Sequence, residues 1–567
     1  MENQDRPADA VGPVAGGAVA LGGAAATLAY ASNNMEGLDL SGLASTMSGS
    51  SPAPAKSSSA YYDDLSPEQA SRFLSQATNG ATRKEIDYLV KNGIEPWLRA
   101  QFAMPRGQTH YNWIWSKGSR QTQGTQANRI WAGSIWRQLI SAPDQLRQRA
   151  ALALLDIMVV SIHGLVPPYP QYAMAAYMDL LLDHAFRNYR ELLGAITTSS
   201  AMGQFLTFLN NSKSDAKGSI PDENYARELM QLFTIGLYEL NMDGTQKTAR
   251  GGQPIETYTQ DDVSQLARVF TGLRLPSKNL PEAHRGRLVM DASINETGAS
   301  TFLGATISGG GMKAVDAALD VIFHHPNVPP FVAHALIQRL VTSNPSPRYI
   351  RRVASIFADN GSGVRGDMKA VLMAILLDDE ARSDEALTAP HTGKLRDPVQ
   401  RMTGWARAFD ASSKSGEWKI GDTSSAAGGL AQCPGFSPSV FNFFRPLYTP
   451  PNSELQRRGL VAPELQIADE QSVIAYVNVM FDAIKKGAGG TDVPADYRRL
   501  MALAPDPSKL MDEVNLLLAA GQLSSATYGT IVSALNSIGT GNDAGRLNRI
   551  WTAILLTMAS PDYLVLQ

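Results

Sequence analysis

The apolar positions of this chain recur with the 3.6-residue period of amphipathic helices over most of its length. Ser66 stands three residues before Gln69, with Pro67 as the first helical position, and Thr82 stands three residues before Glu85. Both arrangements are typical of helix N-termini. The same pattern predicts further helices over residues 130–160, 174–193, 202–209, 223–235, 259–271, 313–323, 330–341, 348–358, 367–377, 399–409 and from about 471 onwards.

Four polar or glycine-rich segments lack this period and are predicted to be loops. They cover residues 104–128, 211–220, 241–257 and 411–453. Short β-like runs at 287–290 and 301–303 predict one small β-hairpin between residues 274 and 308. The chain shows no alternation of buried strands with helices, which argues against a nucleotide-binding α/β fold. We therefore expect an all-α fold, a globular array of many helices with long loops and one small hairpin.

The N-terminal segment differs from the rest of the chain. Residues 10–35 carry no charge and include the small-x-small sequence Ala29-Tyr30-Ala31, but the residues before them are mainly acidic. Residues 41–60 have the Ser/Ala/Pro-rich composition of a linker. We expect residues 1–60 to be a disordered segment, an export signal with its linker, or a weak membrane anchor within 10–35. Residues 61–567 form the helical domain, as one unit or as two helical lobes divided near residue 275.

Composition narrows the classes of partner. Hydrophobic residues make up 44% of the 567 residues and charged residues 18%, and the formal net charge is −3. This balance argues against a nucleic-acid binder held by a general basic face and leaves only a local basic patch open. The single cysteine, Cys433, excludes an intramolecular disulfide and a multi-cysteine metal site. The chain contains neither a His-Glu-x-x-His zinc motif nor a Gly-x-Ser-x-Gly elbow.

A long segment of the chain resembles a known family. Residues 221–236, PDENYARELMQLFTIG, resemble the central motif of the bacterial family catalogued as domain of unknown function 1800. Other segments are similar to the same family in the same order, and the resemblance covers roughly residues 65–567. These segments are residues 73–80, 258–263, 324–327, 394–398, 437–442 and 559–564.

The resemblance implies a mostly helical, exported protein but no reaction. Members are commonly encoded beside an exported family that resembles sulfatases, domain of unknown function 1501, so such a protein is the expected partner. Many members carry a Trp-His-Asn-His-Phe-like element, where this chain reads LDIMVVSIH over residues 155–163. At most one histidine, His163, remains, so a role of that histidine pair is not carried over to this chain.

The helix predicted at the central motif places polar side chains along one face. At 3.6 residues per turn, Glu223, Asn224, Arg227 and Glu228 share a stripe opposite the apolar face. If the following helix packs beside it, its acidic start joins them. The four carboxylates with Arg227 then suit a divalent cation or acid–base chemistry, and the alternative is a set of ordinary ion pairs. The candidate catalytic residues are Glu223, Arg227, Glu228 and Asp261, with Asn224 and Asp262 as candidate binding residues.

Two later segments provide further candidate binding residues. Lys394 and Arg396 precede a helix start at Pro398 and form either an anion clamp or a surface ion pair. Residues 436–448 contain five aromatic residues in a loop context. Such a segment forms a platform for sugar rings or a partner chain, or a hydrophobic plug over the core. Its candidate binding residues are Phe441, Phe443 and Phe444.

Two functions from different classes remain open. The first is an exported helical binding or assembly factor at the cell envelope, in the periplasm or outside the cell. The alternative is an exported hydrolase or modifying enzyme that uses the carboxylate stripe, with a divalent cation as the candidate cofactor. A chain whose N-terminal segment is merely a tail would instead be cytoplasmic.

Overall fold

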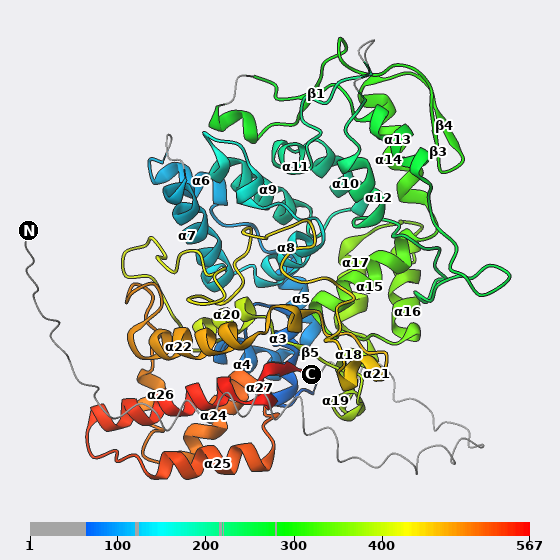
Figure 1. Cartoon of the computed structure of the whole chain (residues 1–567). Coiled ribbons are helices and arrows are strands. Elements are labelled where there is room, and N and C mark those ends of the chain that lie inside the picture. The colour runs from blue at the N-terminus through cyan, green and yellow to red at the C-terminus, as the bar shows by residue number, and fades with distance from the viewer. Residues whose placement is uncertain (1–63, 120–123, 215–217, 219, 278–279) are drawn as a thin grey trace, which may run out of the picture.

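The computed structural model describes residues 64–119, 124–214, 218, 220–277 and 280–567. Residues 1–60, for which a disordered segment, an export signal with its linker and a weak membrane anchor within 10–35 were the alternatives, lie outside these ranges. Helices make up 54% of the described residues, whose strands form only two-stranded sheets, and this confirms the predicted all-α class (Figure 1). No helix within the described ranges is long and apolar enough to cross a membrane.

The first half of the described chain is a series of helices of moderate length. In chain order they are α3 (Pro67–Ala77), α4 (Arg83–Asn92), α5 (Ile94–Ala103), α6 (His110–Ser116), α7 (Thr125–Ser141), α8 (Gln145–Ile157), η2 (Ile162–Gly164), α9 (Pro170–His184), α10 (Tyr189–Thr197), α11 (Ser200–Phe205), α12 (Asn224–Gln231) and α13 (Gln260–Val269).

The second half begins with short strands and then continues as helices. Its helical elements are η3 (Pro281–His284), α14 (Gly311–His324), α15 (Val328–Leu340), α16 (Pro347–Ala358), α17 (Met368–Leu376), α18 (Asp379–Arg382), α19 (Asp384–Thr388), α20 (Pro398–Ala408), α21 (Glu454–Arg457), η4 (Pro463–Ile467), α22 (Glu470–Lys486), α23 (Arg498–Met501), α24 (Pro507–Ala519), α25 (Ser525–Asn536), α26 (Asp543–Ala559) and α27 (Pro561–Leu564).

Local sequence signals account for several helix boundaries. Ser66 forms the predicted capping box with Gln69, and its hydroxyl accepts a hydrogen bond from the Gln69 N–H. The predicted helix over 130–160 is broken between α7 and α8, because Pro143 forces Ala142 into an extended conformation. The predicted loop over 104–128 was wrong in part. Its residues 110–116 form α6, which packs against α9 and is too short to show a clear apolar period.

The strands form three separate pairs. The predicted hairpin is present as β3 (Ser300–Phe302) and β4 (Ala305–Ile307), joined by two residues of positive φ, Leu303 and Gly304. The run near residue 289 does not join it. That run forms β2 (Val289–Met290), paired with β1 (Leu273–Arg274). The third pair, β5 (Lys394–Leu395) with β6 (Val565–Leu566), ties the segment before α20 to the C-terminus.

The glycine-rich loop over 241–257 belongs to a two-stranded arm that projects from the body at the right of Figure 1. Isolated antiparallel bridges between Tyr238 and Glu256 and between Thr248 and Pro254 hold the arm together.

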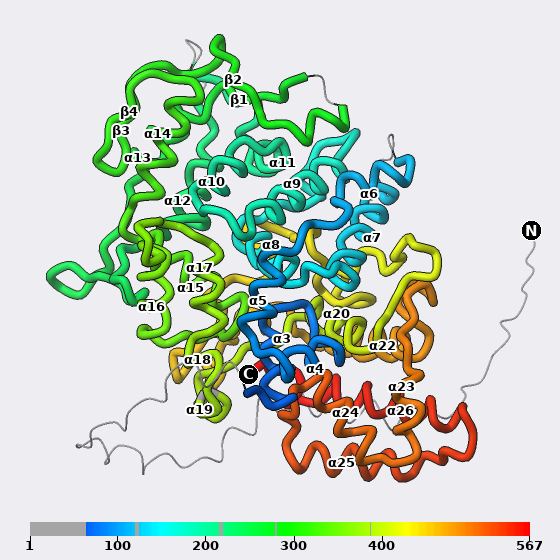
Figure 2. Tube along the Cα trace, turned by 180° about the vertical axis from the view of Figure 1, so that it is seen from behind, coloured from blue at the N-terminus to red at the C-terminus, as the bar shows by residue number. Residues whose placement is uncertain are grey.

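Buried side chains from before and after residue 275 form one continuous hydrophobic cluster. Helix α8 packs against α9, α15, α5 and α3. The last helices return to the first, since α24 packs against α3, and in Figure 2 the C-terminus lies beside the blue N-terminal helices. The core therefore joins the two ends of the described chain.

Candidate functional site

The predicted polar stripe lies where α12 packs against α13. Glu223 accepts hydrogen bonds from Arg227 (3.1 Å), from the Gln260 side-chain amide (2.7 Å) and from the Ser264 hydroxyl. Arg227 also donates to the side-chain oxygen of Gln260 at 3.0 Å. The structure therefore brings Glu223 and Arg227 together, and it does so within a set of ion-pair and amide contacts between the two helices.

The remaining residues of the stripe have separate surroundings. Asp262 closes the capping box of α13 with Thr259 and also accepts from the Leu303 N–H (2.7 Å). Burial opposes ionisation there, but these hydrogen bonds lower the pKa of Asp262. Asp261 is exposed and Asn224 is half-buried. Glu228 is 9% exposed, and burial raises its pKa against the opposing charge of Arg227. In the described part of the chain no three His, Cys, Asp or Glu side chains gather as a metal site.

Lys394 and Arg396 both point into the protein. Lys394 Nζ lies 3.1 Å from Glu464 Oε1, and the two side chains are 2% and 1% exposed. The guanidinium group of Arg396 donates to the carbonyl oxygens of Tyr563 and Val565 and lies over the Tyr563 ring. Burial lowers the pKa of Arg396 to about 10. Both cations thus make internal contacts, and neither forms an exposed clamp for an anion.

Lys394 belongs to a buried group of charges that we call the charge cluster. Its members come from α8, α15, β5, the start of α20 and η4, and their charges influence one another. They are Arg149, Asp156, Arg339, Lys394, Asp397 and Glu464.

The aromatic segment covers this cluster. The Phe444 ring is 2% exposed and lies 4.9 Å from the guanidinium carbon of Arg339. Phe443 is half-buried against the core, and Phe441 is half-buried beneath Arg445. Phe444 therefore packs onto the charge cluster and Phe443 onto the hydrophobic core, which is the arrangement of the hydrophobic plug given as the alternative above.

Asp156 borders a hollow of about 10 Å³ at the edge of the charge cluster, together with Asp397, Ser437 and Asn442. The Asn442 side-chain amide donates to Asp156 Oδ1. Desolvation of the carboxyl group and the nearby Asp397 charge raise the pKa of Asp156 to about 6, although Arg339 and Lys394 oppose this. The hollow has room for about one water molecule.

We expect Asp156→Asn to change the pH dependence of stability. Between pH 4 and 6 the folded protein holds a proton on Asp156 that the unfolded chain releases, so stability falls as pH rises through this window. Asparagine does not titrate, so the variant gains up to about 3 kcal/mol relative to the parent protein between pH 4 and 7. Urea unfolding of both proteins at pH 4 and at pH 7 measures this gain. An identical pH dependence of the free energy of unfolding in the two proteins would contradict it.

Two more open hollows lie elsewhere, along α10. One of about 360 Å³ lies between α10 and α14, and one of about 300 Å³ lies between α9, α10 and the segment after η3. The linings of the two hollows share His184, Thr198 and Arg287, so the hollows adjoin, and we call the pair the arginine trough. Its name comes from the arginines that line it: Arg106, Arg187, Arg190, Arg285 and Arg287.

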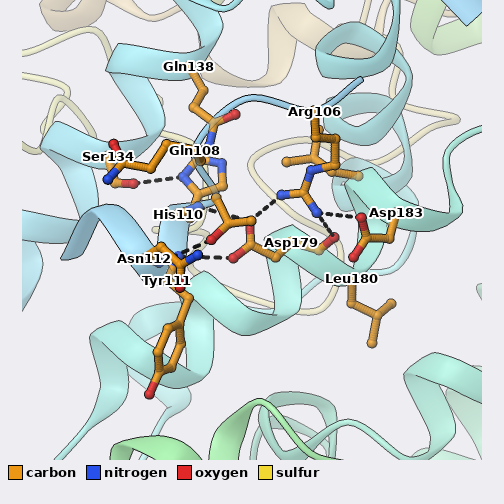
Figure 3. A network of polar contacts seen from close by, with 12 residues as sticks. Arg106, Gln108, His110, Tyr111, Asn112, Ser134, Gln138, Asp179, Leu180 and Asp183 are labelled. Atoms are coloured by element: carbon orange, nitrogen blue, oxygen red, sulfur yellow. Dashed lines mark hydrogen bonds and ion pairs between the residues drawn. The ribbon is translucent and has the colours of Figure 1, made fainter. Parts of the chain in front are cut away.

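Two of these arginines are paired with carboxylates. Arg106 lies against Asp179 and Asp183, and Arg190 pairs with Asp320 at 2.7 Å and with Asp316 at 3.5 Å. Figure 3 shows the Arg106 guanidinium group between the two aspartates on α9. These contacts fix both arginines in the sides of the trough.

The other three arginines of the trough are exposed: Arg187, Arg285 and Arg287. Among the described residues none of the three forms an ion pair with a carboxylate. The one further carboxylate that lines the trough is Glu191 on α10. Five arginines thus lie beside five carboxylates, Asp179, Asp183, Glu191, Asp316 and Asp320, and Arg187, Arg285 and Arg287 differ from the other two in that no described ion pair holds them.

Buried Asp179 organises the side of the trough shown in Figure 3. Its two oxygens accept from the backbone N–H groups of His110 and Tyr111, both at 2.9 Å, and from Arg106. Burial raises the pKa of Asp179, although Arg106 and the two backbone N–H groups act to lower it. The His110 ring in turn lies 2.8 Å from the Ser134 hydroxyl. This network joins α6, α7 and α9 and holds Arg106 in place.

The arginine trough was not predicted from the sequence, although the sequence contains two clusters of basic residues that belong to it. The run His284-Arg285-Gly286-Arg287 concentrates basic residues, and Arg187 and Arg190 are spaced three apart. What the sequence does not show is that these two groups, about a hundred residues apart, meet across α10.

Comparisons with known proteins bear on the family alone. No curated protein and no solved structure matches this chain. A family model described as "Protein of unknown function (DUF1800)" matches residues 72–565, which include the central motif, the charge cluster and the arginine trough. This match covers well over half of the sequence, and the chain belongs to the DUF1800 family of proteins of unknown function.

Proposed function

We propose that this chain is an exported binding protein of the cell envelope that holds an anionic ligand in the arginine trough. One observation carries the proposal. Three exposed arginines without carboxylate partners line an open depression in a chain whose formal net charge is −3. Unpaired cations gathered in one concave place are the electrostatic arrangement that attracts and holds anions.

The residue type defines the chemistry of the ligand. A guanidinium group presents a planar fork of N–H donors that matches the oxygens of carboxylate, phosphate or sulfate. Arg106 and Arg190 are already paired with aspartates, so they would act as N–H donors in fixed positions. Arg187, Arg285 and Arg287 provide positive charge that is not paired with a described carboxylate. An anion in the trough would gain charge-assisted hydrogen bonds from these guanidinium groups.

The experiment is a calorimetric titration of the protein with the bisphosphate ester of 1,6-hexanediol at low salt. We expect saturable binding, because the ester presents the oxyanions that the arginines match, and no binding of uncharged 1,6-hexanediol. The double variant Arg285→Ala/Arg287→Ala is expected to bind at least tenfold more weakly, which corresponds to about 1.4 kcal/mol.

A matched control removes the same charge elsewhere. Arg348 and Arg458 are exposed, and Arg348→Ala/Arg458→Ala should bind the bisphosphate as the parent protein does. Absence of binding by the parent protein, or equal binding by both double variants, would contradict the proposed function.

Two further parts of the proposal rest on the sequence alone: export of the chain and a sulfatase-like partner. The uncharged stretch over 10–35 with its small-x-small sequence supports cleavage after Ala31, and the family resemblance supports a sulfatase-like partner. The N-terminal residue of the mature protein, determined by mass spectrometry of cell fractions, tests export. A cytoplasmic chain that still begins at residue 1 would contradict it.

A further inference from the structure

We infer that the ligand of the arginine trough carries two separate oxyanion groups joined by a short neutral linker, one group for each hollow. This inference rests on the proposed function and names the chemical class of its ligand. It follows from how charge and apolar surface are distributed along the trough.

The positive charge is divided between the two hollows. Arg187 and Arg190 line only the hollow beside α14, whereas Arg106 and Arg285 line only the hollow beside α9. Arg287 lines both and stands between them. A ligand with one small anionic group contacts one end of this arrangement and leaves the unpaired arginine at the other end without a partner.

Helix α10 shows where the two hollows meet. The hollow beside α14 extends along α10 from Arg190 to Thr198, and the hollow beside α9 begins at Ala195, Thr198 and Ser199. Two oxyanion groups, one in each hollow, therefore lie on either side of Thr198, close enough for a short linker to join them.

Apolar side chains line part of each hollow and favour a neutral linker. The hollow beside α14 includes Met312, Val315 and Leu319, and the hollow beside α9 includes Ala176 and Leu180. These apolar surfaces cannot pair with a charged group, and their burial against apolar groups of a ligand is favourable.

Carboxylates in the same trough disfavour a ligand that is charged along its whole length. Asp183, Glu191 and Asp316 line it between the arginines, and each would repel an additional anionic group placed beside it. A ligand with two discrete anionic groups avoids these contacts, whereas an evenly charged polymer meets them.

Calorimetric titration with two phosphate esters tests the inference. The probes are the 1,6-hexanediol bisphosphate, whose phosphates can reach both hollows, and hexyl phosphate, which carries one phosphate on the same alkyl chain. Once the first phosphate is bound, the second binds intramolecularly, so we expect the bisphosphate to bind at least tenfold more tightly. Arg187→Ala and Arg285→Ala should each bring bisphosphate affinity down to that of hexyl phosphate.

The outcomes separate this inference from the proposed function. Equal affinity for the two esters, with both lost in Arg285→Ala/Arg287→Ala, would overturn the two-group ligand and leave an anion-binding trough. Loss of the tenfold advantage in only one of the two single variants would also overturn it. If neither ester binds the parent protein, the proposed function fails and the inference fails with it. Arg285→Lys, which keeps the charge beside the Tyr111 ring, checks that loss at this position reflects charge.

Discussion

Replacement of Lys394 by methionine is expected to lower the free energy of unfolding by about 3–5 kcal/mol, because it leaves a buried carboxylate without its cation. Lys394 Nζ lies 3.1 Å from Glu464 Oε1, with both side chains almost fully buried. Glu464 Oε2 has no hydrogen-bond partner among the described residues, so the lysine is its main compensation. Urea unfolding followed by circular dichroism measures the loss.

Two further variants distinguish a lost ion pair from a lost side-chain contact. The double variant Lys394→Met/Glu464→Leu removes both charges, so it should recover a large part of the stability that the single variant loses. Lys486→Met breaks an exposed pair with Asp482 and should lose less than about 1 kcal/mol. A loss in Lys394→Met no larger than that in Lys486→Met would contradict the description of the charge cluster.

Replacement of Asp179 by alanine is expected to destabilise the protein by about 3–4 kcal/mol, because two buried backbone N–H groups lose their acceptor at once. The N–H groups are those of His110 and Tyr111, and Arg106 loses one of its two carboxylate partners in the same substitution. The start of α6 then loses its hydrogen bonds to α9 and keeps only the packing contacts between the two helices. Thermal unfolding and urea unfolding measure the effect.

Asp183 provides the matched control for this prediction. It pairs with the same guanidinium group of Arg106, but its side chain is 51% exposed and accepts no backbone N–H among the described contacts. Asp183→Ala should therefore lose less than about 1 kcal/mol. Equal losses in the two variants would show that Asp179 acts only as a counter-charge and that the backbone contacts contribute little.

The helices were predictable where a local signal marks them. The Ser66 and Thr82 caps and the apolar period fix α3 and α4 within a residue or two. The break at Pro143 is also a local effect, and a long apolar run simply concealed it. Helix α6 was missed because its seven residues form barely two turns, and their burial depends on α9, more than fifty residues later.

The candidate site was less predictable because its residues are distant in the sequence. The contact of Glu223 with Arg227 follows from their spacing on one helix, and it was foreseen. Lys394 pairs with Glu464, and Arg187 lines one depression with Arg287, across 70 and 100 residues. The spacing of residues in a single sequence does not indicate which distant side chains come into contact, because the packing of whole helices decides this.

The charge cluster and the arginine trough also differ in a way that sequence does not reveal. Lys394 and Arg339 are buried and act on neighbouring protein groups, so they contribute to the fold. Arg187, Arg285 and Arg287 are exposed, and no described carboxylate compensates them. A cationic side chain is available to a ligand when it is exposed and has no carboxylate partner. When it is buried and paired it stabilises the protein, and the residue type alone does not distinguish the two cases.

Anion binding in the arginine trough can be tested by the protection of individual arginines from phenylglyoxal in the unmodified protein. Modification of each arginine is measured by peptide mass spectrometry with and without saturating 1,6-hexanediol bisphosphate. We expect the ester to protect Arg187, Arg285 and Arg287, while exposed Arg348 and Arg458 react equally in both samples. Unchanged modification of the three trough arginines, or equal protection of all five, would contradict it.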